Sequence, residues 1–201
     1  MSSSFVNYQI HSGNFDDIVR LAERLVETKM YISQPKNGWI SVYDEASEII
    51  DSERSRTLAQ ELSSVILNIV IVFIVYKSDY LVYLLYNNGH LVDEYNSDPD
   101  NFYFGFEQIN SQLKEQVKGN PEALLTYCLP ETELESLINL FVQREAFVEY
   151  MIYELAPLLG IDEVRATSGF SDVEDGYVYD SDIEAGEEVR EDQKFYLVQP
   201  N

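Results

Sequence analysis

The chain has little of the two side chains that carry most disulfide and zinc chemistry. It contains one cysteine, Cys128, and two histidines, His11 and His90. A lone cysteine cannot form an internal disulfide and is typical of a protein from a reducing compartment. Two separate histidines and no CxxC motif exclude a His-rich or Cys-rich zinc site. We therefore expect a cytoplasmic protein with a buried structural thiol.

Long hydrophobic runs are also missing. The longest, residues 69–76, has eight residues, whereas a membrane-spanning helix needs about 20. The first residues, MSSSFVNYQIHS, have neither the basic nor the apolar region of a secretory signal. These absences predict a soluble protein with no membrane partner.

Basic residues are scarce. The chain has 13 Lys and Arg against 36 Asp and Glu, a net charge of −23, and residues 161–201 alone carry 12 acidic and 3 basic groups. Such a surface repels nucleic acid and anionic membranes, so we expect no nucleic-acid partner. It suits a basic partner protein or a divalent cation, although an acidic surface also simply keeps a protein soluble.

Motifs of well-known catalytic sites are absent. The chain has no GxSxG nucleophile turn, no GxxxxGK[ST] phosphate loop and no GxGxxG dinucleotide fingerprint. The pattern therefore indicates no catalytic residues and no organic cofactor.

Residues 68–102 hold the clearest structural signal. Residues 69–76, IVIVFIVY, are β-branched and apolar throughout, which is typical of a central strand covered on both faces. Residues 80–86 and 90–95 follow as two more strands. Asn88-Gly89 between them favours a tight hairpin, since a type I′ turn needs positive φ at both central residues.

Earlier strands are expected at residues 5–10 and 39–43. A helix from Phe15 that ends before Pro35 separates them, and a second helix spans residues 52–65. The order β-α-β-α-β-β-β predicts an α+β fold with a mixed, partly antiparallel five-stranded sheet and helices on at least one face.

Three regions follow from this pattern. Residues 1–101 form the α+β sheet domain. Residues 102–161 carry helical periodicity, starting with a helix over 102–117, and form a helical subdomain packed on it. Residues 162–201 are acidic and form an extended or partly disordered tail, whose apolar end at 195–198 could dock as a strand.

Acidic side chains gather after the last predicted strand of the meander. Carboxylate oxygens are the ligands of hard cations, so these residues are candidate divalent-metal ligands. The turn before the preceding strand should approach them, because antiparallel neighbours reverse direction. The candidates are Asp79, Asp93, Glu94, Asp98 and Asp100. The alternative is that they are turn and helix-capping residues.

A second pair, Asp44-Glu45, ends the 39–43 strand. If that strand and the 90–95 strand end at one edge of the sheet, four carboxylates would gather there and raise one another's pKa or demand a cation.

Four segments resemble an uncharacterised family of bacterial proteins. They are GWISVYDE (38–45), SDYLVYLLYNNGHLVDEYNSDPDNF (78–102), ELAPLLGI (154–161) and RATSGF (165–170). The resemblance spans residues 38–170 and implies a bacterial cytoplasmic protein. The family has no assigned activity, so it transfers no functional residue.

The first hypothesis for function is a non-enzymatic interaction or regulatory module that presents its acidic surface to a basic protein. The alternative is a cation-binding protein or cation-dependent enzyme that uses the five carboxylates. The third is an acidic mimic of nucleic acid, suggested by the Asp and Glu residues of 172–192.

Overall fold

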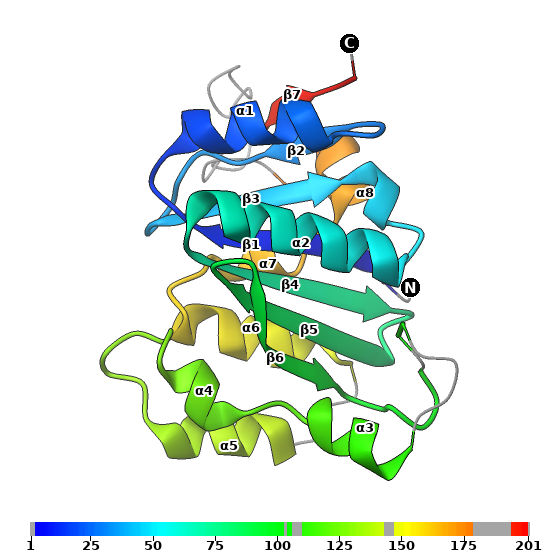
Figure 1. The fold of residues 1–201 in the computed structure, drawn as a ribbon, viewed down its shortest axis with the longest axis vertical. Coiled ribbons are helices and arrows are strands. Elements are labelled where there is room, and N and C mark those ends of the chain that lie inside the picture. The colour runs from blue at the N-terminus through cyan, green and yellow to red at the C-terminus, as the bar shows by residue number, and fades with distance from the viewer. Residues whose placement is uncertain (1–2, 103, 106–109, 143–146, 179–193, 201) are drawn as a thin grey trace.

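A computed structural model describes residues 3–102, 104–105, 110–142, 147–178 and 194–200. In these residues, one antiparallel sheet of seven strands runs in the order β6-β5-β4-β1-β3-β2-β7. The strands are β1 (Phe5–His11), β2 (Met30–Ile32), β3 (Trp39–Asp44), β4 (Ile69–Tyr76), β5 (Tyr80–Asn87), β6 (His90–Asn96) and β7 (Tyr196–Val198). Figure 1 shows β7 beside α1 at one end of the sheet and β6 at the other.

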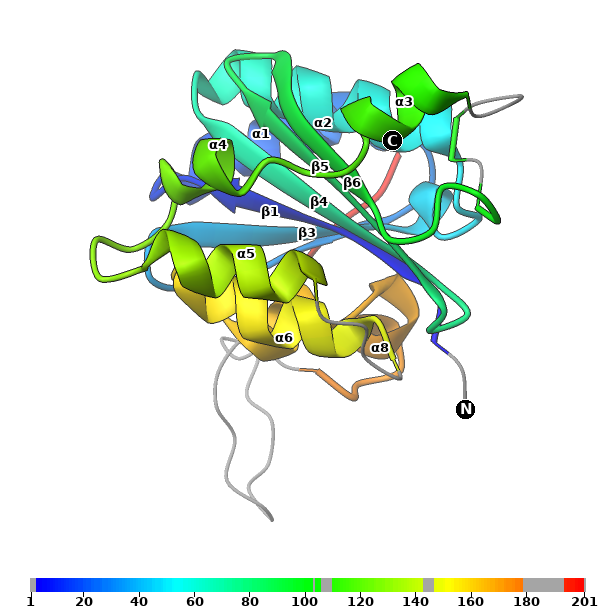
Figure 2. The same cartoon turned by 90° about the horizontal axis from the view of Figure 1, so that it is seen from below.

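Helices cover both faces of this sheet. On one face lie α1 (Phe15–Leu25) and α2 (Ser52–Ile66), and on the other lie α5 (Leu134–Val142), α6 (Glu149–Leu158) and α8 (Phe170–Glu174) (Figure 2). The remaining helices are η1 (Glu45–Ser47), α3 (Ser111–Gln116), α4 (Pro121–Leu125) and α7 (Glu163–Ala166). None of the described helices is both long enough and apolar enough to cross a bilayer.

The central strand β4 explains why both faces need a cover. Its side chains alternate between two apolar clusters: Val70, Val72 and Ile74 pack under α1 and α2, whereas Ile71 and Phe73 pack under α5 and α6. Successive strand side chains point to opposite faces, so a strand without polar positions must be covered twice. The predicted α+β class and the central position of this strand are confirmed.

The prediction of a five-stranded, mixed sheet was wrong. The sheet has seven strands, and every described pairing is antiparallel. The missed strand β2 has three residues and follows a helix that ends at Leu25, well before Pro35. Three residues are too few to show a period of two. The other addition, β7, is the apolar end at 195–198, and it pairs with β2.

Two further segments differ from their prediction, one expected to be helical and one expected to be extended or disordered. Of the helix expected over 102–117, the described residues show only Ser111–Gln116 as helix, and Phe102 and Phe104 instead pack into the apolar cluster under α2. Residues 162–178, expected to be extended or disordered, contain α7 and α8. There Phe170 and Val173 are buried with Tyr43 of β3. Helices of four or five residues leave little periodic signal.

Two tight turns join the central strands. The β5–β6 turn has Asn88 at φ 51° and Gly89 at φ 77°, which confirms the predicted hairpin. The β4–β5 turn has the same positive-φ geometry with unfavourable residues: Lys77 and Ser78 both have φ 56°. Left-handed backbone costs about 1–2 kcal/mol per residue for side chains of this kind.

Candidate functional site

The five predicted metal ligands do not form one site. Asp93 and Glu94 are neighbours on β6 and therefore face opposite sides of the sheet. Asp93 lies on the face of α4 and α5, and Glu94 lies under α2. Both are buried, with 8% and 7% of their surfaces exposed. Among the residues that the structure describes, no group of three or more His, Cys, Asp or Glu is placed to hold a metal ion.

Asp93 is held by two neutral donors. The hydroxyl of Tyr83 donates to Asp93 Oδ2 over 2.5 Å, and the backbone N–H of Asn120 donates to the same oxygen over 2.9 Å. Burial, followed by the charge of Asp93, raises the pKa of Tyr83 above its ordinary value. The phenol therefore stays protonated and donates. Because Asn120 is also the N-cap of α4, this carboxylate fixes the start of that helix.

Glu94 is neutralised by an arginine from α2. Arg56 donates to both carboxylate oxygens, over 3.1 Å to Oε2 and 2.5 Å to Oε1. The same guanidinium lies 5.6 Å from the ring centroid of Phe104. A bidentate pair of this kind is a strong charge-assisted contact, so Glu94 serves to join β6 to α2.

The other three candidates, Asp79, Asp98 and Asp100, do approach one another. They line one cavity of about 620 Å³ at the end of β6, as the antiparallel strands predicted. Lys114 also lines this cavity, and it forms an ion pair with Asp100. Asp98 accepts from the side-chain amide of Asn101 over 2.8 Å and stabilises the turn that follows β6. Three of the five predicted cation ligands therefore line one cavity, and the positive charge of Lys114 lies in the same cavity.

Asp44 and Glu45 do not join these carboxylates. Strands β3 and β6 run in the same direction, so their C-terminal ends lie at the same end of the sheet. Strands β1, β4 and β5 lie between them. Four strand spacings amount to about 19 Å. Asp44 is fully buried and receives two hydrogen bonds from Arg54, over 2.8 Å and 3.1 Å, and one from the Ser47 hydroxyl over 2.6 Å. It is therefore a closed structural ion pair.

The sequence interpretation missed both arginines. Arg54 and Arg56 carry no distinguishing sign of their own, since they lie among the polar residues that precede the apolar stripe of α2. The sign in the sequence that could have revealed these arginine partners is the position of Asp44 and Glu94 at the ends of buried strands. A carboxylate there needs a cation or several hydrogen-bond donors.

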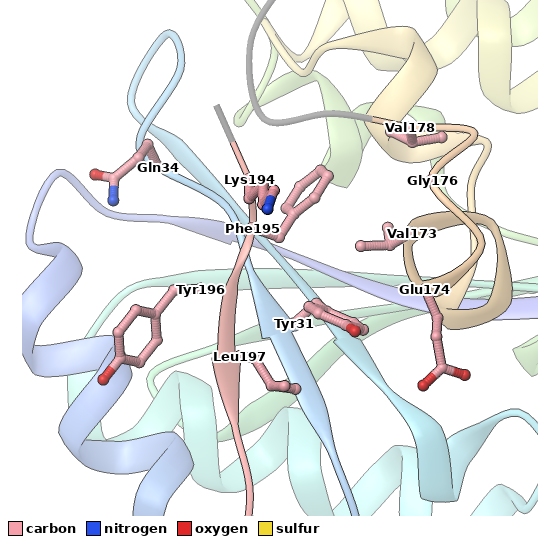
Figure 3. A pocket seen from close by; sticks show the side chains of 10 residues that line it. All are labelled: Tyr31, Gln34, Val173, Glu174, Gly176, Val178, Lys194, Phe195, Tyr196 and Leu197. Carbon is pink, nitrogen blue, oxygen red and sulfur yellow. The ribbon is translucent and has the colours of Figure 1, made fainter. Parts of the chain in front are cut away.

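A second cavity lies between α8 and the edge strand β7 (Figure 3). It measures about 620 Å³ and is lined by both aromatic and charged residues, among them Tyr31, Glu174, Lys194 and Phe195. Glu174 already accepts from Lys29 over 2.5 Å. Burial, followed by the charge of Glu174, raises the pKa of Tyr31, so its phenol is not a base at neutral pH.

This cavity also marks where the acidic segment joins the fold. Residues 179–193 carry seven acidic side chains and one basic side chain, and their two flanking residues, Val178 and Lys194, both line the cavity. The chain then returns to the sheet as β7. The described residues that precede and follow this acidic stretch in the sequence therefore both lie at the cavity, whereas residues 179–193 themselves are outside the described part of the chain.

Cys128 has the environment of a structural thiol. Burial raises its pKa to about 11, and its Sγ donates to the backbone carbonyl of Leu124 over 3.5 Å. A thiol of that pKa is protonated at neutral pH and is a poor nucleophile.

Comparison with known proteins gives no assignment: no family model, no curated protein and no solved structure matches the chain. The resemblance of residues 38–170 to uncharacterised bacterial proteins therefore stays a prediction.

Proposed function

We propose that this protein is a non-enzymatic interaction or regulatory module that binds a cationic partner protein through its acidic surface. The observation that carries the proposal is the use that the fold makes of its few basic residues. The chain has 13, and within the part of it that the structure describes, seven form ion pairs with the chain's own carboxylates. They are Arg20, Lys29, Lys36, Arg54, Arg56, Lys114 and Lys118.

An eighth basic residue is buried. Arg165 of α7 is 5% exposed and donates to the hydroxyl of Ser33 and the carbonyl of Gln34, over 3.1 Å and 2.9 Å. Internal contacts thus use most of the positive charge, and the acidic excess is left for solvent or for a partner. A surface of one sign speeds the association of an oppositely charged partner and is strongly weakened by salt.

The test is binding of a fluorescent octalysine peptide at low salt and at roughly 0.5 M salt, where the screening length is only a few ångströms. Octaglutamate is the control probe. The proposal predicts tight binding of octalysine at low salt, a loss of at least about tenfold at high salt, and no binding of octaglutamate. Failure of octalysine to bind at low salt would contradict it.

The rival hypothesis, a divalent-cation protein, is tested by calorimetric titration with Ca²⁺, Mg²⁺ and Mn²⁺. The cavity of Asp79, Asp98 and Asp100 is its strongest support. Our proposal predicts no binding heat from any of the three ions. Saturable heat that disappears in an Asp98→Asn variant would favour the rival.

We also propose a cytoplasmic location. It is supported by the lone thiol of Cys128, which has no disulfide partner in this chain.

A further inference from the structure

A shallow aromatic groove lies where the β4–β5 turn meets α6. Its cavity measures about 390 Å³, and its lining includes Ser3, Ser78, Phe147, Glu149, Tyr150 and Tyr153. The three aromatic side chains recur every third residue along α6 and the residues just before it. Each is about half exposed, at 51%, 56% and 52%. Aromatic rings grouped in this way on a surface are typical of a binding site.

Glu149 lies in this groove with only one of its carboxylate oxygens engaged. Oε1 accepts a hydrogen bond from the hydroxyl of Ser78 over 2.6 Å. Oε2 is buried and receives no hydrogen bond from the part of the chain that the structure describes. Buried polar atoms without a partner are rare in folded proteins, and each calls for an explanation.

The β4–β5 turn holds this arrangement in place. The backbone N–H of Ser3 donates to Ser78 Oγ over 2.7 Å, so the hydroxyl proton is directed to Glu149. Ser78 is 3% exposed and, like Lys77, has a φ of 56°. Strained backbone persists where the surrounding structure enforces it, and such sites are often functional.

The missing partner of Glu149 should be a cation. Two carboxylates that this fold buries, Asp44 and Glu94, each have an arginine on both oxygens. A third, Asp93, is held by neutral donors, but among its described hydrogen-bond partners only Tyr83 has an aromatic ring of the kind that lines this groove. Within the described residues, no Lys or Arg lies over the rings of Phe147, Tyr150 or Tyr153. Aromatic faces attract ammonium and guanidinium groups, and the carboxylate supplies the counter-charge.

We propose that this groove binds a lysine or arginine side chain that a partner protein presents. The cationic head pairs with the Glu149 carboxylate, whose buried Oε2 turns toward the groove on binding, and its aliphatic stem packs on Tyr150 and Tyr153. The inference rests on the proposed function, since it specifies where the acidic surface meets its cationic partner. An organic cation fits better than a metal ion because the walls are aromatic and the groove offers one carboxylate.

The test compares Glu149→Gln with Glu154→Gln. Both variants remove one negative charge from α6, but Glu154 is exposed on the helix surface. Fluorescent octalysine and octaarginine are the probes. We expect Glu149→Gln to weaken binding of at least one probe about tenfold or more, and Glu154→Gln to change it less than about twofold. Tyr153→Ala, an exposed position, should weaken the same probe even if Glu149→Gln folds poorly.

The possible outcomes separate the two proposals. If the unmodified protein binds neither probe at low salt, the proposed function fails and the groove with it. If it binds them in a salt-sensitive way but Glu149→Gln, Tyr153→Ala and Glu154→Gln behave alike, the groove is overturned and the proposed function stands. Norleucine-containing peptides of the same length should not bind, and equal binding by them would also overturn the groove.

Discussion

Asp44 and Glu149 are both carboxylates with buried oxygen atoms, but Asp44 is buried as a whole and Glu149 only in part. Asp44 is fully buried, and Arg54 and Ser47 supply donors to both of its oxygens. Glu149 has one donor, Ser78, and one buried oxygen without a described partner. The first arrangement is complete without any other molecule, and the second is completed by a cation from outside. Two of the chain's few arginines, Arg54 and Arg56, pair with buried carboxylates, and Glu149 has no such partner among the described residues.

The largest effect should come from breaking the complete pair. Arg54→Ala leaves the Asp44 carboxylate buried without its cation, and we expect the free energy of unfolding to fall by about 3–5 kcal/mol. Denaturation by urea measures it. Arg20→Ala is the control, since Arg20 pairs with Asp17 at the surface and should cost less than about 1 kcal/mol. Similar losses from both variants would remove the distinction between buried and exposed pairs.

Asp93 tests the same idea with a buried carboxylate whose described donors are uncharged. Tyr83→Phe removes the phenol that donates to it over 2.5 Å and leaves the Asn120 N–H as its remaining described donor. We expect a loss of about 1–3 kcal/mol in the free energy of unfolding, the cost of a buried acceptor without its donor. Tyr177→Phe, at an exposed position, should be neutral. An unchanged stability for Tyr83→Phe would show that Asp93 needs only one donor.

Asp162 is intermediate between Asp44 and Glu149, because it is partly buried and paired with a lysine. Burial opposes its ionisation, but Lys36 at 2.7 Å and the Arg165 backbone N–H at 3.0 Å outweigh burial and lower its pKa. A lowered pKa gives stability that is present above the ordinary value of 3.8 and is lost as the pH falls through the folded-state pKa.

Asp162→Asn should therefore be less stable than the unmodified protein at pH 7, by about 1 kcal/mol. The gap should narrow as the pH falls below 3.8 and close once the pH is below the lowered folded-state pKa, because the carboxyl is then protonated in both states. Denaturation midpoints at several pH values measure this. A gap that is independent of pH would mean that the charge of Asp162 contributes nothing.

The smallest effect concerns the turn that supports Glu149. Lys77→Asn replaces a residue that disfavours positive φ with one that tolerates it, and it leaves the Ser78 hydroxyl in place. We expect a gain of up to about 1 kcal/mol in the free energy of unfolding. Asn88→Lys in the β5–β6 turn is the reciprocal control and should lose a similar amount. If Lys77→Asn is destabilising, the turn is not strained in the way proposed.

The sequence predicted the parts of the fold with strong local signals. The apolar run 69–76 and the Asn88-Gly89 turn each depend on neighbouring residues, and both are confirmed. The strand β2 and the helices α7 and α8 depend on distant contacts, such as Phe170 with Tyr43. Periodicity within a short window of sequence cannot predict contacts between distant residues.

The candidate sites show the same limit. The approach of Asp79 to the end of β6 follows from antiparallel pairing and was predictable. The arginine partners of Asp44 and Glu94 come from α2, and the sequence does not show which face of the sheet a helix covers. The sequence did not reveal the Glu149 groove, because its aromatic residues lie in a helix that is apolar along most of its length. Its one local sign is the spacing of Phe147, Tyr150 and Tyr153, opposite the buried stripe of α6.

The central claim is that the Glu149 carboxylate binds a cationic side chain from a partner, and an NMR titration tests it most directly. Octalysine or octaarginine is added to isotope-labelled protein at low salt, and the backbone amide shifts are followed. We expect the earliest and largest changes at Ser78, Glu149 and Tyr150, with those at Asp44 and Glu94 unaffected. Changes spread evenly over the acidic surface, or absent from these three amides, would contradict the account.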